Sequence, residues 1–225
     1  MRPSDHLVAV PNVSEGRDRT AIARLAESIE DAGGRVLDVH SDVVHNRTVF
    51  TAAGDGPTLV AAMAALARSA CAIDLTRHAG VHPRLGVLDV CPFVVDDANV
   101  ADVVDAARAA GAAIWEEAGI PVYLYGYAAT RRECEHLPAL RQGGTARLAE
   151  RSETGLPPDF GTTPVDPRRG VACVGARDVL IAFNVWLRAD AGAARSIARE
   201  VRSTLGSAGV RALGLDLGNG QHDGW

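Results

Sequence analysis

The sequence contains no lysine, so arginine supplies all 23 of its basic residues. Arginine carries a planar fork of donors that binds carboxylates through paired hydrogen bonds, and clustered arginines therefore favour recognition of acidic ligands. The base composition of the gene would explain the missing lysine equally well. The formal net charge is -5 and no basic tail is present, which argues against nucleic acid as a partner.

Cysteine is scarce, and long apolar runs are missing. The cysteines lie far apart, which is typical of small buried side chains in a reducing compartment and unlike a disulfide framework or a zinc motif. They are Cys71, Cys91, Cys134 and Cys173. The first ten residues lack the apolar core of a signal peptide, and Arg68 interrupts the longest apolar stretch, residues 59–73. We therefore expect a cytoplasmic protein with no membrane partner.

The chain has 225 residues, 47% of them apolar, which is enough for one large domain or two small ones. Apolar periodicity predicts strands at residues 7–13, 35–40, 46–53 and 86–94, and helices at residues 17–32 and 58–73. The resulting β-α-β-β-α-β order is that of the ferredoxin-like sandwich. This is an α+β fold with a four-stranded antiparallel sheet and two helices on one face.

The rest of the chain adds a predicted helix at residues 99–118 and a strand at 121–125. Residues 126–170 form a long irregular segment with two short helix candidates, at 130–135 and 146–152. A strand at 178–188, a helix at 189–205 and a strand at 210–217 then predict a partial second ferredoxin-like subdomain. The predicted domains are residues 1–177 and 178–225. An incomplete sheet has an edge that the first domain or another chain must cover.

Residues 73–93 (IDLTRHAGVHPRLGVLDVCPF) concentrate the side chains suited to chemistry. His78 and His82 change protonation near neutral pH, which suits acid–base catalysis or metal binding. A glycine between them and a proline after them disfavour a helical zinc site, and a third ligand would have to be Asp74 or Asp89. We expect no metal. A metal-dependent hydrolase using His78, His82 and Asp89 is the alternative from another class, and a loop histidine bonded to a backbone carbonyl is the plainer interpretation of His78.

Several motifs, in order along the chain, carry a resemblance to a known family. They are residues 10–17 (VPNVSEGR), 45–50 (HNRTVF), 77–93 (RHAGVHPRLGVLDVCPF), 121–126 (PVYLYG), 158–161 (PDFG), 175–177 (GAR) and 180–184 (LIAFN). Any one of them alone is weak. Together they resemble the formiminotransferase family, which comprises the glutamate formimidoyltransferases and the transferase part of the formimidoyltransferase-cyclodeaminases.

The resemblance implies a reaction and its partners. A formimino group would pass from N-formimino-L-glutamate to tetrahydrofolate, which acts as co-substrate, in one-carbon metabolism and histidine degradation. Family members hold the folate in a cleft between two stacked α/β subdomains and usually form homodimers. The implied partners are therefore the two small molecules and a second copy of the chain.

The resemblance also implies site residues. The family's catalytic histidine falls on His82, a general base and then a general acid. Its folate-contacting loop falls on Gly161, Thr162, Thr163, Pro164, Val165, Asp166, Pro167, Arg168, Arg169 and Gly170. The carboxylates of both substrates make Arg84, Asn46 and Arg47 further binding candidates.

These assignments have plainer alternatives. Arg168 and Arg169 also fit a solvated loop pair, and residues 46–47 fit a polar strand start. His40, Asp42 and His78 are candidate supporting residues, and the family often has an acid at the position of His40.

The sequence departs from the family in the length of its second subdomain, which normally runs about as far as the first. We expect an active short-form transferase that completes its cleft by dimerising. Two alternatives stay open at this point. One is a folate-binding protein without efficient turnover. A folate cleft that lacks one wall would admit water and hold the substrates less precisely. The other is a non-catalytic partner protein that keeps the first subdomain for assembly.

Overall fold

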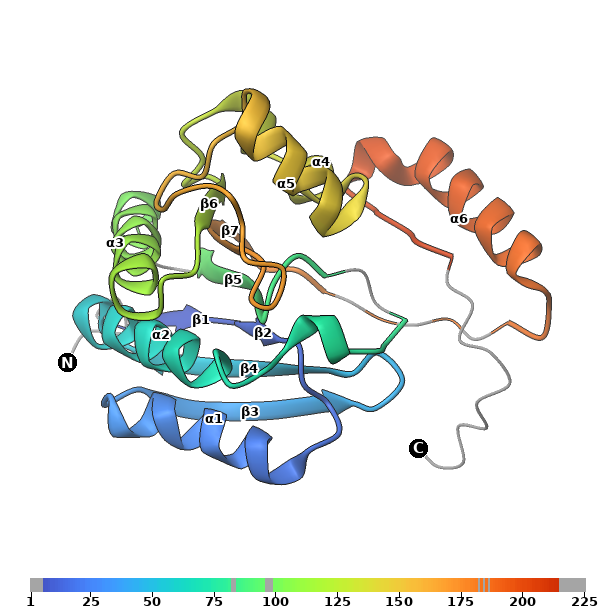
Figure 1. Ribbon diagram of the computed structural model, residues 1–225. Helices are drawn as coiled ribbons and strands as arrows, with labels where there is room; N and C mark the ends of the chain where they lie inside the picture. Colours follow the sequence, from blue (N-terminus) through green and yellow to red (C-terminus); the bar gives the residue numbers. More distant parts are fainter. Residues whose placement is uncertain are drawn as a thin grey trace. The chain divides into compact units, whose positions relative to one another are not determined.

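The computed structural model describes residues 6–81, 84–95, 99–181, 183, 185 and 187–214. The chain divides into two units, residues 1–179 and residues 180–225, and each is described by itself. The first unit contains a mixed sheet with helices on both faces (Figure 1). The predicted α+β class is therefore confirmed.

The strands of the first unit form one seven-stranded sheet in the described chain. They are β1 (Leu7–Ala9), β2 (Asn12–Val13), β3 (Arg35–Asp42), β4 (Arg47–Gly54), β5 (Leu88–Val95), β6 (Val122–Gly126) and β7 (Ala172–Asp178). β1 and β2 lie end to end between β4 and β5 and run antiparallel to both. β3 pairs antiparallel with β4. On the other side, β7 pairs parallel with β5, and β6 pairs parallel with β7.

The predicted strand at residues 7–13 is interrupted in the structure because of Pro11. Proline has no amide hydrogen to donate to a ladder, so β1 ends before it and β2 begins after it. The carbonyl of Pro11 still accepts a hydrogen bond from the Phe50 amide at 2.9 Å, which keeps the two short strands in line.

Three helices cover one face of the sheet: α1 (Arg19–Asp31), α2 (Gly56–Ala70) and α3 (Val100–Ala118). Each begins at a side chain that accepts first-turn amides, namely Asp18, Asp55 and Asn99. The alanine-rich helix α2 packs against both α1 and α3 (Figure 1). The core under these helices is contiguous because small α2 side chains allow close packing on the sheet.

The opposite face of β5, β7 and β6 carries a second core. It is covered by α4 (Leu137–Arg141), α5 (Gly144–Thr154) and part of the chain before β7. Leu140 and Leu148 of these helices are buried against Tyr123 and Cys173 of the sheet. The segment predicted to be irregular therefore folds over the sheet. It contains α5 near the predicted second helix and the 3-10 turn η3 (Arg132–Cys134) within the first.

The predicted strand at residues 178–188 is wrong over its described residues, because none after Asp178 is in a strand. Residues 182, 184 and 186 of that prediction lie outside the described residues. The strand that is present, β7, comes just before this segment and has the sequence ACVGARD. Its small residues gave no strand pattern, yet β7 lies between β5 and β6, where ladder hydrogen bonds and burial determine the conformation.

The second unit contains helix α6 (Ala191–Leu205) and the 3-10 turn η4 (Gly206–Ala208). The Asp190 side chain caps α6 by accepting from the Ala193 amide at 2.8 Å. Residues 210–214 of the strand predicted at 210–217 are not in a strand, and the rest lie outside the described residues. No helix in the described part of the chain is long and apolar enough to cross a membrane.

Candidate functional site

The segment between α2 and β5 contains the residues that the sequence predicts to be catalytic. It begins with the 3-10 turn η2 (Leu75–Arg77), which Asp74 caps by accepting from the Thr76 amide at 3.0 Å and the Thr76 hydroxyl at 2.6 Å. His82 and Pro83 lie outside the described residues. The structure therefore describes the two flanks of the predicted catalytic position.

The loop of residues 161–170 is hydrogen-bonded to both flanks. The Leu75 amide donates to the Arg168 carbonyl at 2.9 Å. The Val87 amide donates to the Arg169 carbonyl, also at 2.9 Å, and the Val171 amide donates to the Leu85 carbonyl at the same distance. These hydrogen bonds join residues 82 to 93 positions apart in the sequence, so two segments that were both singled out from the sequence lie side by side.

Two glycines make this contact possible. Gly170 has φ +68°, and a Cβ there would lie 2.0 Å from the Leu85 carbonyl oxygen. A Cβ on Gly86 would lie 2.0 Å from the Val171 carbonyl oxygen. No side chain fits at either position, because the obstructing atoms are backbone.

Asp166 shapes the end of the loop. Its side chain accepts from the Arg168 amide at 2.9 Å, and its carbonyl accepts from the Arg169 and Gly170 amides at 3.1 and 2.8 Å. Val165 is buried in the second core and anchors the loop. The exposed residues of the loop are Thr162, Thr163, Pro164, Asp166, Pro167 and Arg168.

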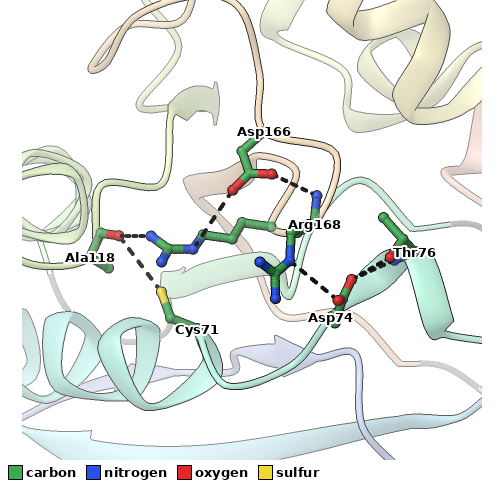
Figure 2. Close-up of polar contacts among 7 residues, drawn as sticks. Cys71, Asp74, Thr76, Ala118, Asp166 and Arg168 are labelled. Atoms are coloured by element: carbon green, nitrogen blue, oxygen red, sulfur yellow. Dashed lines mark hydrogen bonds and ion pairs between the residues drawn. The ribbon is translucent and has the colours of Figure 1, made fainter.

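Arg168 and Arg169, predicted to receive folate carboxylates, each have a partner of opposite charge. Arg168 Nε lies 3.2 Å from Asp74 Oδ2, and Figure 2 shows this pair beside the Asp166 turn. Arg169 donates to the Ala118 carbonyl at 3.2 Å and lies 4.0 Å from Asp166 Oδ2. A small cavity of about 80 Å³ is lined by Cys71, Ile73, Asp166, Arg168 and Arg169. The Arg168 side chain is 69% exposed, so a ligand can reach its guanidinium.

Asn46 ties three loops together. It is buried with φ 49°, its Oδ1 accepts from the Gly16 amide at 2.9 Å and its Nδ2 donates to the Ala79 carbonyl at 3.1 Å. Both polar ends of the side chain are thus engaged with backbone. Asn46 therefore positions the loops around the segment of His78 and Arg84. The sequence had suggested two other roles for it, a substrate contact or a polar residue at the start of a strand.

Asp42 is paired with His45, a partner that the sequence did not indicate. Its Oδ1 accepts from the amides of Val44 and His45, both at 2.8 Å, and its Oδ2 lies 2.8 Å from His45 Nδ1. Burial acts to raise the pKa of Asp42, but the hydrogen bonds from His45 and Val44 outweigh it, so the pKa lies below its usual value. His40 is exposed on β3, where it pairs across the ladder with Val49.

His78 contacts the turn before β4 and an arginine of its own loop. Its Nε2 lies 3.1 Å from the Asn46 carbonyl oxygen and 3.1 Å from Arg84 Nη1. A carbonyl only accepts and a guanidinium only donates, so the ring nitrogen satisfies one of them at a time. Arg84 also donates to the Gly80 carbonyl at 2.9 Å and so braces the turn that precedes it.

Asp89 is a buried carboxylate on the other flank of the segment. Its side chain is 2% exposed, Oδ1 accepts from the Leu85 amide at 2.7 Å and Oδ2 is ion-paired with Arg141 of α4. Burial raises the pKa of Asp89, and the Arg141 guanidinium, the Leu85 amide, Arg47 and Arg84 each oppose that rise. Arg141 was not indicated by the sequence, because its position beside Asp89 depends on how the 126–171 segment folds back.

Comparison with known proteins decides the family. Residues 6–177 match the N-terminal subdomain of the formiminotransferase domain. The chain belongs to the formiminotransferase family. The resemblance derived from the sequence motifs is therefore confirmed.

Curated relatives of this formiminotransferase chain are similar over most of its length. Glutamate formimidoyltransferase of Streptococcus pyogenes serotype M1 is 39% identical over 202 residues, covering 88% of this chain and 68% of the relative. Glutamate formimidoyltransferase of Thermoplasma acidophilum is 42% identical over 184 residues, 79% of this chain and 60% of the relative. Formimidoyltransferase-cyclodeaminase of Dictyostelium discoideum is 41% identical over 197 residues, but only 37% of that protein is covered. The chain thus spans at most about two thirds of these relatives.

Proposed function

We propose that the protein transfers a formimino group from N-formimino-L-glutamate to tetrahydrofolate. The observation that supports this most is the contact between the 161–170 loop and both flanks of residues 82–83. In the family resemblance the loop holds folate and His82 is catalytic. A rigid contact between the two segments is what transfer chemistry needs, because reacting atoms must be held in register.

The proposed chemistry uses one histidine twice. N5 of tetrahydrofolate attacks the formimino carbon and forms a tetrahedral centre, and His82 accepts the N5 proton. The bond from that carbon to the glutamate nitrogen then breaks as His82 returns the proton to the departing nitrogen. Histidine suits both steps because its ordinary pKa lies close to neutral pH.

Folate binding is assigned to the exposed surface of the 161–170 loop. Polar backbone and the side chains of Thr162 and Thr163 are accessible there, and Arg168 offers an exposed guanidinium to the acidic glutamyl tail. The ion pair between Arg168 and Asp74 lies at the surface, where such pairs contribute little to stability, so a folate carboxylate can replace Asp74 at little cost.

The same proposal includes the ferredoxin-like arrangement, the domain bounds, the cytoplasmic location and the homodimer. The antiparallel arrangement of β1/β2, β3, β4 and β5 supports a ferredoxin-like unit in a domain of residues 1–177. The four free thiols support a cytoplasmic setting. The homodimer rests on the family resemblance alone.

The metal-dependent hydrolase is the weaker alternative because of Asp89. That carboxylate is buried and is bound to Arg141 and to the Leu85 amide, so a cation would have to displace the Arg141 guanidinium. His78 likewise contacts a carbonyl and an arginine.

Transfer by the purified 225-residue chain tests the proposal. With N-formimino-L-glutamate and tetrahydrofolate, we expect turnover that falls ~10²-fold or more in His82→Ala, the scale of general acid–base catalysis. His78→Ala should lose less, and His6→Ala, at the exposed end of β1, serves as the histidine control. Near-normal turnover of His82→Ala would remove that residue from catalysis. Folate binding without any transfer would support the folate-binding alternative instead.

A further inference from the structure

A β-bulge in β5 turns two consecutive residues towards helices α4 and α5. The pairing of β5 with β2 skips Asp89, which is therefore an extra residue in the ladder. Leu88 and Cys91 belong to the core under α1, α2 and α3, whereas Val90 belongs to the second core. Asp89 faces the same side as Val90, because its carboxylate is paired with Arg141 of α4. The bulge thus directs a charged side chain at the helices that cover this face.

Asp89 connects α4 to the segment that follows His82. Its Oδ1 accepts from the Leu85 amide at 2.7 Å, its Oδ2 is ion-paired with Arg141, and the side chain is 2% exposed. A buried ion pair is often no more stabilising than apolar side chains of similar volume, so stability alone does not account for one here. What this pair fixes in place is the peptide of Leu85, three residues after His82 in the sequence.

Thr145, in the first turn of α5, holds the neighbouring peptide. Its partly buried hydroxyl donates to the Arg84 carbonyl at 3.0 Å, although the two residues are 61 positions apart in the sequence. Helices α4 and α5 therefore both hold the segment after His82. Helix α4 acts through Asp89, and α5 acts directly on the backbone.

The carbonyls of residues 84–87 all accept hydrogen bonds. Besides Thr145, the donors are the Val171 amide and the hydroxyl and amide of Ser14. A segment that is bonded at each carbonyl moves as a unit, so the loss of one contact is transmitted to the neighbouring peptides. The bonds from Thr145 and Asp89 can be removed one at a time, because each belongs to a side chain.

We propose that Asp89 and Thr145 are positioning residues for His82, acting through the backbone of residues 84–87. The inference rests on the proposed function for the catalytic role of His82. It gives α4 and α5 a part in transfer besides covering the sheet. Misplacement of reacting groups by about 1 Å can cost ~10²-fold in rate, so a contact two residues from the histidine is close enough to affect turnover.

Removal of the Thr145 hydroxyl tests the contact from α5. Thr145→Val keeps the shape of the side chain but loses the hydrogen bond, and Thr145→Ser keeps the hydroxyl. We expect kcat for transfer to fall ~10-fold or more in Thr145→Val, with both KM values within ~2-fold, and to recover in Thr145→Ser. Thr154→Val is the matched control, because the hydroxyl of Thr154, an exposed residue of the same helix, also donates to a carbonyl, that of Glu150 at 2.9 Å. Equal losses in the two valine variants would overturn the role of Thr145.

Asp89→Asn tests the contact through α4. The carboxylate uses one oxygen for the Leu85 amide and the other for Arg141, and an amide has only one oxygen to offer. We expect kcat to fall ~10-fold or more with both KM values within ~2-fold. An unchanged kcat would overturn the role of Asp89. Where this variant fails to fold, the Thr145 variants decide, because valine and serine change that side chain by only one or two atoms.

The effect of Thr145 should depend on the presence of His82. In a His82→Ala background, Thr145→Val should change the residual turnover by less than ~2-fold, because a residue that acts through His82 has nothing left to position. A purely structural role would lower turnover to the same extent in both backgrounds, and that result would overturn the proposal.

A signal from His82 itself separates the inference from the proposed function. In NMR spectra of the 225-residue chain, the ring signal of His82 is the one that His82→Ala removes. Thr145→Val should shift this signal, whereas Thr145→Ser and Thr154→Val should leave it in place. A shift in a chain that shows no transfer would support the positioning of His82 and refute the proposed function. An unshifted signal would overturn the positioning, and transfer by the same chain would leave the proposed function intact.

Discussion

Asp42 shows how one carboxylate at the end of β3 determines the path of the chain. It bonds to two successive amides and to the His45 ring, so the turn into β4 is closed by a single side chain. Short acidic side chains favour such local bonds to backbone, which is a property of the sequence. The choice of His45 as partner depends on the turn geometry.

The lowered pKa of Asp42 predicts a pH-dependent loss of stability. A carboxyl group whose pKa is lower in the folded state than in the unfolded state stabilises the fold at pH values above its ordinary pKa, which is 3.8 for aspartate. That contribution is lost as the pH falls through the lower pKa of the folded state. Asp42→Asn should therefore unfold at a lower urea concentration than the wild type at pH 7. The difference between the two urea midpoints, which is the gap to be measured, should disappear below about pH 4. Asp38→Asn, in the same strand, controls for loss of charge. A gap that is constant with pH would contradict the prediction.

Individual residues differ in how far the sequence anticipated their roles. The contact of His78 with a carbonyl matches the plainer interpretation of that histidine. Asn46, which the sequence suggested for substrate contact, bonds in the structure to Gly16 and Ala79. Those partners are more than 29 residues away in sequence, so no local pattern indicates them.

At the scale of elements, the crossing of the 161–170 loop with residues 85–87 holds the candidate site together. Gly86 and Gly170 face one another across an isolated antiparallel bridge. The loop therefore ends in a short piece of sheet that leads directly into β7. Displacing that bridge would move the 161–170 loop and the flank of His82 together.

Gly170→Ala tests this crossing against a matched glycine. Gly119 has nearly the same φ, +63° against +68°, but nothing lies within 4 Å of a Cβ there. Gly119→Ala should cost about 1–2 kcal/mol of unfolding free energy from the left-handed backbone alone. Gly170→Ala should cost about 3 kcal/mol or more, because overpacking against the Leu85 carbonyl adds to that strain. Urea denaturation measures both, and equal losses would mean that crowding at the crossing is unimportant.

The predicted helices and strands are confirmed where apolar residues recur at a regular spacing and are buried on one face of the element. Helices α1, α2 and α3 and strands β3, β4 and β5 fall close to the expected ranges. β7 was missed because its alanine, glycine and cysteine lack β-former character, and α4 was missed because it is only five residues long. Both are stabilised by neighbours that are distant in the sequence.

At the scale of the molecule, both apolar cores lie in residues 1–179. The only apolar core residue outside that range is Ala198 of α6 among the described residues. All strands of the described chain also lie in the first unit. The stability of the sheet should therefore not depend on residues 180–225.

A chain of residues 1–179 should fold by itself and unfold in one cooperative urea transition. Trp115 is the only tryptophan in this range and lies on α3 against Gly161, so its fluorescence reports directly on the packing of the 161–170 loop. Circular dichroism should follow the same transition. A broad transition, or fluorescence and dichroism that do not coincide, would show that the second unit contributes to the fold.

The sequence by itself determined the family, the mixed α+β class, the main helices and strands of the first unit, and the two segments that meet at the candidate site. These follow from local periodicity, caps and ordered motifs, which act over short distances along the chain. The tertiary structure alone decided the central place of β7, the pairing of Asp42 with His45, the contact of the 161–170 loop with residues 75–87, and the meeting of Arg141 with Asp89. Those features arise from ladder pairing, a bulge and chain reversal, and they bring together residues that no local pattern relates.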